Sequence, residues 1–190
     1  MQLLINSIAA HVTLTQEAMQ RIPAFFEPME TKRADFLLRE GQVCRHEYFV
    51  LNGCCRQYET DAAGNTNILH FAVEGWWITD LDSMLAETPS LFNIDVVEAG
   101  TVLRISQQQL EALFLEIPAV ERYYRIISQR AYAALQRRIL FLQKPALVRY
   151  QEWLARYPFL EKRLPQYQIA AYLGITPESL SRLRNKIAKF

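Results

Sequence analysis

Polar side chains near the C-terminal end of the chain have the types and spacing of a DNA-reading helix. Two short amphipathic stretches, 166–173 and 177–189, are separated by only three residues. Ala170 is a small residue where two steeply crossed helices would touch, and Gly174 tolerates the positive φ that a tight turn requires. Thr176 is a favourable N-cap for the second stretch. The pattern therefore predicts a helix-turn-helix.

The second stretch would present a row of hydrogen-bond donors and acceptors to a duplex. Arg, Asn, Lys and Ser bond readily to base edges and phosphates, and the N-terminal part of such a helix enters the major groove. The predicted DNA-contacting residues are Gln166, Gln168, Thr176, Glu178, Ser179, Ser181, Arg182, Asn185 and Lys186. The alternative is a helical hairpin that only packs on its neighbour. Because residues 145–190 carry eight basic side chains against three acidic ones, we favour DNA binding.

The segment before these helices has the texture of a β-domain. Short apolar runs alternate with turn residues from 29 to 105, which is typical of an all-β sandwich or barrel. The predicted strands are 35–39, 48–52, 54–59, 67–73, 93–97 and 101–105, with turns at 52–53, 61–65 and 98–100 and a short helix at 78–89. Residues 3–27 are predicted helical, with Thr15 as an N-cap, and Ser106 would cap a helix that begins at 107.

A long helix is predicted from 118 to 143, with another from 146 to 157 after Lys144-Pro145. The 118–143 helix and the residue before it carry a heptad-like stripe that contains Ile117, Val120, Tyr124, Ile127, Ala131, Ala134, Arg138 and Phe141. A two-stranded coiled coil needs such a stripe, although Arg138 interrupts it, and a single amphipathic helix on its own core is the alternative. We favour a homodimer through the 117–141 helix. The fold class is then α+β: a β-roll sensor (1–116), a dimerisation helix (117–143) and a helix-turn-helix domain (144–190).

This order of elements resembles the Crp/Fnr family of bacterial transcription regulators, whose sensor is a cyclic-nucleotide-binding-type β-roll. The residues that carry the resemblance are Gly41, the Tyr-Phe-Val-Leu-Asn-Gly run at 48–53, Gly75 and the Ile-Thr-Pro-Glu-Ser-Leu-Ser-Arg run at 175–182. The resemblance implies a cytoplasmic homodimer that reads a palindromic operator, with RNA polymerase as a further candidate partner. It also implies that Arg182 reads guanine, while Glu178 accepts from cytosine or orients the arginine.

Two departures from the family pattern bear on DNA binding. Pro177 stands where the family often has an arginine, and no residues follow Phe190 for the usual hairpin wing. We therefore expect fewer DNA contacts. The second candidate function is a ligand-binding or protein-interaction module with a degenerate helix-turn-helix.

The sensor lacks the cation that a cyclic nucleotide requires. The resemblance places the ribose-binding triplet at 79–81 and the phosphate-binding pair at 90–91, but no Arg or Lys lies between Glu59 and Val102. Because a desolvated anion needs a cation or several N–H donors, we expect neither cAMP nor cGMP to bind tightly. An unknown effector could occupy a tentative pocket formed by Phe71, Trp77, Asp80, Leu81, Met84, Ser90 and Leu91, with Trp76 and Phe92 near it. That these side chains only fill the roll is equally open.

Other classes of function have little support. Cys44, Cys54 and Cys55 form no CxxC pair, and three thiols are too few for an iron–sulfur cluster, so no cofactor or metal is expected. A haem ligand such as His46 or His70 is the minor alternative. No catalytic constellation and no phosphate-cradling glycine loop point to an enzyme. Neither a secretory signal nor a run of 18 apolar residues is present, and we expect no membrane partner.

Overall fold

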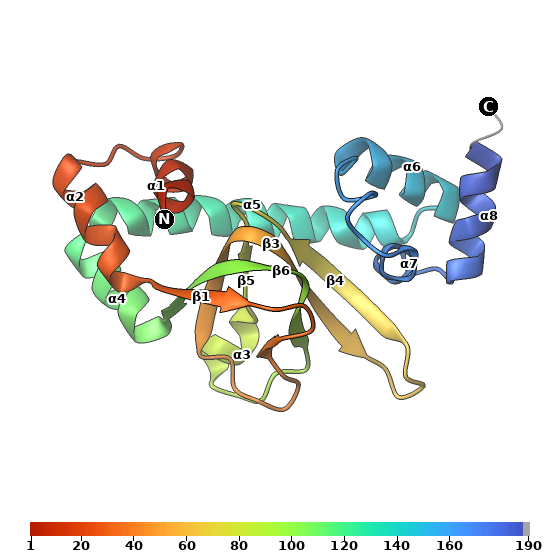
Figure 1. The fold of residues 1–190 in the computed structure, drawn as a ribbon, viewed down its shortest axis with the longest axis horizontal. Helices are drawn as coiled ribbons and strands as arrows, with labels where there is room; N and C mark the ends of the chain where they lie inside the picture. Colours follow the sequence, from red (N-terminus) through yellow and green to blue (C-terminus); the bar gives the residue numbers. More distant parts are fainter. Residues whose placement is uncertain (188–190) are drawn as a thin grey trace. The chain divides into compact units, whose positions relative to one another are not determined.

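The computed structural model describes residues 1–187 (Figure 1). The chain forms two compact units. The roll unit consists of Met1–Glu59 and His70–Gln129, and the C-terminal unit of Thr60–Leu69 and Arg130–Phe190. No helix among the described residues is both long and apolar enough to cross a membrane.

The roll has the predicted jelly-roll-like form and is a six-stranded sheet, two of whose strands, 27–31 and 77–78, were not predicted. Its strands are β1 (Glu27–Thr31), β2 (Phe36–Leu38), β3 (His46–Thr60), β4 (Thr66–Ala72), β5 (Trp77–Ile78) and β6 (Asn93–Ser106). The order along the sheet is β1-β6-β3-β4, with β2 added to β6 and β5 to β3. The β1–β6, β2–β6, β3–β5 and β3–β6 pairs are antiparallel. The Asp61 carboxylate accepts from the amides of Ala63 and Asn65, which closes the predicted hairpin loop between β3 and β4.

Two predicted turns are wrong, because β3 and β6 each run through them without a break. The β3–β6 register shifts between Val50 and Cys55, so residues 52–53 and 98–100 form irregularities opposite one another. Gly53 has φ +94°, and a Cβ at Gly100 would lie 2.2 Å from the Asn52 carbonyl oxygen. Glycine here permits two backbones to approach closely in a bulge, which in sequence looks the same as a glycine turn.

Helices precede, interrupt and follow the strands of the roll along the chain. They are α1 (Gln2–Ala9), α2 (Gln16–Arg21), the 3-10 helix η1 (Ile22–Phe25), α3 (Leu81–Ala86), α4 (Gln107–Glu116) and α5 (Pro118–Leu142). The predicted caps are confirmed: Thr15 accepts from the Ala18 amide at 3.1 Å, and Ser106 forms a capping box with Gln109. These caps satisfy amides that the first helical turn leaves without partners.

Two apolar cores hold the roll unit together. One fills the inside of the roll and includes Val50, Met84 and Ile94. The other lies between the roll and its helices, where Phe49 of β3 packs with Val120 of α5.

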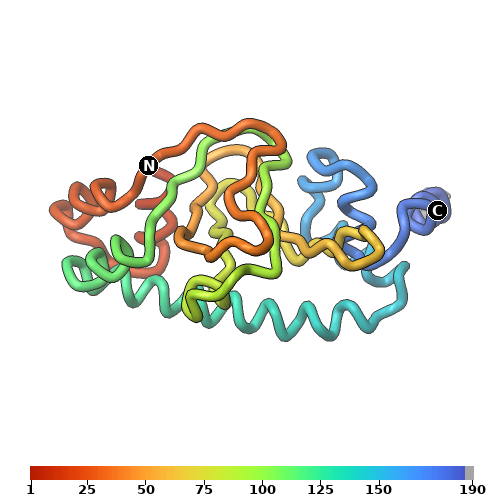
Figure 2. Tube along the Cα trace, turned by 90° about the horizontal axis from the view of Figure 1, so that it is seen from below, coloured from red at the N-terminus to blue at the C-terminus, as the bar shows by residue number. Residues whose placement is uncertain are grey.

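The second core overturns the predicted register of the dimer seam. Ile117, Val120 and Tyr124 are buried within the chain's own core, and Val120 has no exposed surface at all. Farther along α5, a continuous coil in Figure 2, Arg138 and Phe141 contact Tyr172 of the same chain. The predicted stripe is therefore an intramolecular face over much of its length. A helix can be apolar on two sides, and its sequence does not say which side faces its own core.

The C-terminal unit contains α6 (Ala146–Arg156), α7 (Gln166–Leu173) and α8 (Pro177–Ile187). The predicted bounds of α7 are confirmed, and α6 ends one residue earlier than predicted. The predicted end of α8 at Lys189 lies outside the described residues. Buried Trp153, Leu173 and Leu180 lie on three different helices and form the interior of this unit.

Candidate functional site

A tight, fully capped turn joins α7 to α8. Gly174 ends α7 with φ +64°, and the Ile175 amide donates back to the Ala170 carbonyl at 3.0 Å. Ala170 itself is buried, in agreement with the small residue predicted at the crossing. Thr176 accepts from the Ser179 amide at 3.2 Å and so caps α8. The turn chemistry predicted from sequence is confirmed, and it fixes where α8 begins.

The side chains predicted to read DNA gather on the exposed face of α8. Glu178, Ser181, Arg182, Asn185 and Lys186 are exposed, and Ser179 is half-buried. Hydrogen bonds from its own backbone amide and from the Thr176 side chain lower the pKa of Glu178, which therefore stays ionised at neutral pH. The Arg182 Nε lies 3.4 Å from the Glu178 carbonyl oxygen. The face thus offers an anionic acceptor and two cations within three turns of helix.

Glu161 fixes the other side of α8 from within the C-terminal unit. Arg184 is half-buried and pairs with Glu161 at 3.4 Å, and the Glu161 carboxylate also accepts from the Tyr150 hydroxyl at 2.9 Å. Burial, followed by the contact with Glu161, raises the pKa of Tyr150 to about 12, so it remains a donor. Arg184 is therefore a structural cation, in contrast to Arg182.

The start of α7 differs from the prediction. Gln166 is exposed, as a DNA contact requires, but Gln168 is only 4% exposed and donates its amide to the Tyr167 hydroxyl at 3.2 Å. Gln168 is therefore removed from the candidate contacts, because a buried amide cannot reach a duplex. Tyr167 is exposed and joins the candidate surface. Its one signal in the sequence is an aromatic residue between two polar ones at the start of a helix.

In the roll, the side chains of Asp80 and Ser90 lie close together and form a hydrogen bond with each other. Ser90 Oγ lies 2.5 Å from Asp80 Oδ2 and accepts from the Phe92 amide at 3.0 Å. Asp80 also caps α3 by accepting from the Ser83 amide at 3.3 Å. Both side chains are buried. The two positions that the resemblance assigns to ribose and phosphate are thus occupied by an internal contact.

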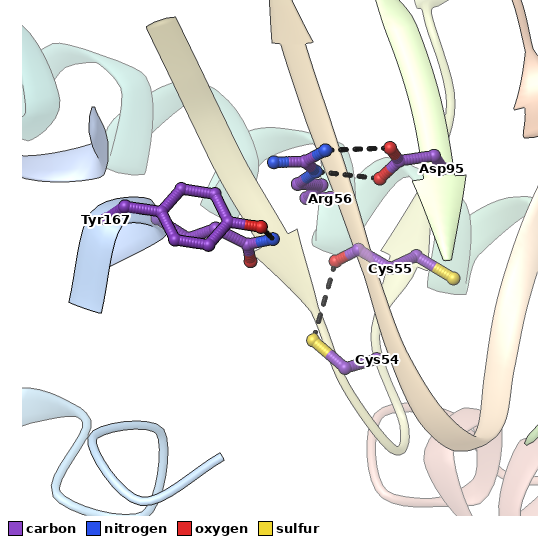
Figure 3. A network of polar contacts seen from close by, with 6 residues as sticks. Cys54, Cys55, Arg56, Asp95 and Tyr167 are labelled. Carbon is purple, nitrogen blue, oxygen red and sulfur yellow. Dashed lines mark hydrogen bonds and ion pairs between the residues drawn. The ribbon is translucent and has the colours of Figure 1, made fainter. Parts of the chain in front are cut away.

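A cation of the roll, Arg56, is already paired. Its Nε and Nη2 donate to the two carboxylate oxygens of Asp95 at 2.7 and 2.8 Å (Figure 3). Both side chains are mostly buried, and the guanidinium carbon lies 4.4 Å from the centre of the Tyr58 ring. A buried two-point pair of this kind is costly to break, so Arg56 does not supply the missing phosphate-binding cation.

The remaining residues of the tentative pocket do not line one cavity. Trp77 packs in the core between roll and helices, whereas Met84 lies in the core inside the roll. Phe71 is buried, Leu81 is exposed, and Leu91 is 70% exposed. Two hollows of about 500 and 450 Å³ are lined by other residues. The predicted pocket is therefore wrong as a set, because its members are divided between two separate cores and exposed positions.

Sequence reasoning missed a buried acid. Glu47 on β3 is 6% exposed, and burial raises its pKa to about 7. Its charge raises the pKa of Tyr124 further, beyond the effect of burial, which shows that the two groups are near each other. The Tyr124 hydroxyl is buried without a hydrogen-bond partner among the described residues. Its sequence context gave no clear signal, because Glu47 follows Arg45 and His46 and stands just before the apolar run 48–51.

The thiols and imidazoles of the described residues form no metal site. Cys44, Cys54 and Cys55 are buried as free thiols, and no group of three or more His, Cys, Asp or Glu side chains could hold an ion. Burial raises the pKa of Cys55 to about 12 and lowers that of His70. These groups therefore remain neutral at physiological pH.

Comparison with known proteins agrees with the fold described above. Residues 28–116 match the family described as the cyclic nucleotide-binding domain. A comparison with curated proteins found no significant match. The solved catabolite activator protein of Thermus thermophilus is 20% identical, with a TM-score of 0.57 over 96% of this chain and 87% of its own.

Two further structures cover nearly all of the chain. A CooA mutant from Carboxydothermus hydrogenoformans is 18% identical, with a TM-score of 0.70 over 94% of this chain and 86% of its own. The c-di-GMP responsive global regulator CLP of Xanthomonas campestris is 14% identical, with a TM-score of 0.73 over 92% of each chain. These structures belong to the Crp/Fnr regulator family, and the likeness shows that this chain has their fold.

Proposed function

We propose that this chain is a homodimeric, DNA-binding transcription regulator of the Crp/Fnr type, acting in the cytoplasm. The observation that carries the proposal is the exposed polar face of α8, which contains Glu178, Arg182, Asn185 and Lys186. The start of this helix is fixed by the Thr176 cap and the Gly174 turn. The regulator fold of the structural neighbours supports the same function.

Each side chain of this face has a role that its chemistry suggests. Arg182 presents a guanidinium that can donate two hydrogen bonds to guanine, and Glu178, one turn earlier, can accept from cytosine. Lys186 and the exposed Tyr167 lie where phosphate contacts would set the register without reading sequence. RNA polymerase is a further candidate partner, but no described surface identifies its contact.

The second copy is proposed to pack on the exposed apolar stripe of α5. Tyr132, Leu135, Ile139 and Leu142 follow one another at steps of three and four residues, and Leu135 and Ile139 are each 62% exposed. Such spacing places them along one side of a helix, which is the pattern of a two-stranded seam. Because identical stripes are complementary about a two-fold axis, a symmetric dimer would place two α8 helices about one DNA turn apart.

The sensor is proposed to act without cAMP or cGMP. Asp80 and Ser90 are bonded to each other, and Arg56 is held by Asp95. A cyclic phosphate would have to break these contacts, and residues 60–101 offer no Arg or Lys in their place. Calorimetry with cAMP checks this directly, since binding at micromolar concentration would contradict it.

Selection of duplexes from a random pool tests the proposed function. The purified full chain should retain palindromic sites with half-sites about one helical turn apart. Its affinity should fall with salt, by a slope of about 0.9 per phosphate contact in logarithmic units. Failure to retain any duplex at low salt would leave the chain as a ligand-binding or protein-interaction module.

A further inference from the structure

Arg138, which interrupts the apolar stripe of α5, contacts two other elements of the C-terminal unit and an aromatic ring of its own helix. Its Nη2 donates to the carbonyl oxygen of Tyr172 in α7 and to that of Ile68 in β4, the latter at 3.4 Å. Its guanidinium carbon lies 3.9 Å from the centre of the Tyr172 ring and 5.1 Å from that of Phe141. One side chain therefore joins α5 to both the hairpin strand and α7.

The interactions of Arg138 are not those of a stabilising ion pair. Among the described residues no carboxylate pairs with it, and its Nη1 is buried without a hydrogen-bond partner. Burial, and to a smaller extent the nearby charge of Arg149, lowers the pKa of the Arg138 guanidinium. Even a complete buried ion pair can often be replaced by apolar side chains with neutral or stabilising effect, and Arg138 lacks the carboxylate that would offset its desolvation. Stability alone therefore does not explain an arginine here.

The geometry of the guanidinium group explains why an arginine stands at position 138. A guanidinium carries five N–H donors on a rigid plane, so one group can serve carbonyls on two elements while its face stacks on an aromatic ring. Tyr172 is in the last turn of α7, where carbonyl oxygens lack helical partners and the helix dipole attracts a cation. Gly174, two residues later, begins the turn that leads into α8.

We infer that Arg138 is a positioning residue that holds the end of α7, and with it the start of α8, against the Thr60–Leu69 segment. This segment is continuous with β3 and β4, which begin or end in the roll unit. The contact itself lies wholly within the C-terminal unit, where it joins α5, α7 and the hairpin segment. Its effect on DNA rests on the proposed function, whereas the holding contact does not.

Amide hydrogen exchange of the full chain tests the holding contact. In Arg138→Met, exchange should quicken by roughly tenfold in peptides covering 66–72 and 170–178, because both segments lose their common contact. The melting temperature should stay the same or rise, which a merely structural role would not allow. The matched control is Arg137→Met, which removes the same charge from an exposed neighbour and should exchange like the wild type.

A conservative variant separates geometry from charge. Arg138→Lys keeps the cation but cannot serve two carbonyls and stack at once, so exchange should remain fast in both segments. Wild-type exchange in Arg138→Met or Arg138→Lys would overturn the inference. So would a fall in melting temperature with faster exchange throughout 130–187, since that pattern is simple destabilisation.

DNA binding gives the second readout. Arg138→Met should bind a selected duplex roughly tenfold more weakly than Arg137→Met, because α8 is no longer held in one orientation. If the two variants bind the duplex with equal affinity although amide exchange is faster in Arg138→Met, the inference that Arg138 positions α8 is wrong. If the wild type binds no duplex, the proposed function fails, and the exchange result still decides whether Arg138 holds α7 to the hairpin.

Discussion

The indole N–H of Trp77 donates a hydrogen bond to the Tyr123 hydroxyl at 2.9 Å, and this hydroxyl lies 3.0 Å from that of Ser7. The contact joins β5 to α5, and α5 to α1. The Trp77 ring also packs edge-on against Phe49 and Tyr124, with ring centres 5.2 Å apart in each case. Trp77, which was predicted from the sequence to line an effector pocket, therefore connects β5 of the roll to the long helix α5.

Trp77→Phe should weaken this connection between β5 and α5. The variant keeps an aromatic ring but loses the indole N–H and part of the buried surface, so the free energy of unfolding should fall by about 1–3 kcal/mol. Urea denaturation measures the change. Trp76→Phe, at a partly exposed neighbour, is the control and should shift it by no more than about 0.5 kcal/mol. Equal losses in both variants would contradict a special role for Trp77.

Glu47 should make stability depend on pH. Its pKa is raised from 4.5 to about 7 in the folded chain, so between these values the folded state keeps a proton that the unfolded state has released. Stability must then fall as pH rises through this window. Glu47→Gln removes the effect, and its stability relative to wild type should rise by on the order of 3 kcal/mol from pH 4.5 to pH 8.

The control for this measurement is Glu111→Gln, at an exposed carboxylate on α4. It should follow the wild-type pH dependence, measured by urea denaturation at a series of pH values. A wild-type curve that does not decline between pH 4.5 and pH 8 relative to Glu47→Gln would show that Glu47 is not held protonated.

The three cysteines should be inert in the native protein. Cys44, Cys54 and Cys55 are each no more than 3% exposed, and the pKa of Cys55 is raised to about 12 by burial. Since the thiolate is the reactive form, a water-soluble disulfide reagent should modify no thiol until denaturant is added. An added surface thiol, Ala63→Cys, should react at once. Rapid native labelling of the wild type would contradict the burial of these side chains.

The exposed stripe of α5 should control the oligomeric state. Lysine at Leu135 or Ile139 places a charge in the proposed seam, and Leu135→Lys with Ile139→Lys should give a monomer of 22.1 kDa in sedimentation velocity. The control is Leu115→Lys on α4, where a leucine that is even more exposed lies outside the stripe. A double variant that stays dimeric would place the interface elsewhere.

Local chemistry made α7, α8 and the turn between them predictable. The αL residue Gly174 and the cap Thr176 act within a few residues of themselves, so their sequence pattern determines the turn. The caps at Thr15 and Ser106 were predictable for the same reason. Gly53 and Gly100 were misinterpreted as turns, because a bulge becomes visible only when the opposite strand is known.

Features that depend on distant packing could not be found from sequence. α5 is apolar toward its own core at Val120 and toward solvent at Leu135, and periodicity alone does not distinguish these faces. The burial of Gln168 depends on the surroundings of α7 rather than on its own pattern. Arg138 stood out in the sequence as a polar residue in an apolar stripe, but only the structure shows that it contacts Tyr172. The burial of Glu47 follows from packing that its neighbours in sequence do not reveal.

The most direct test of the reading helix compares wild type with Arg182→Ala on a selected operator and its single-base-pair variants. The free energy of binding to each duplex is measured at one salt concentration. If Arg182 reads a base, the variant should lose about 1–3 kcal/mol of discrimination at one base pair of each half-site and keep the rest of the profile. Identical profiles for the two proteins would contradict the claim that α8 reads DNA through this side chain.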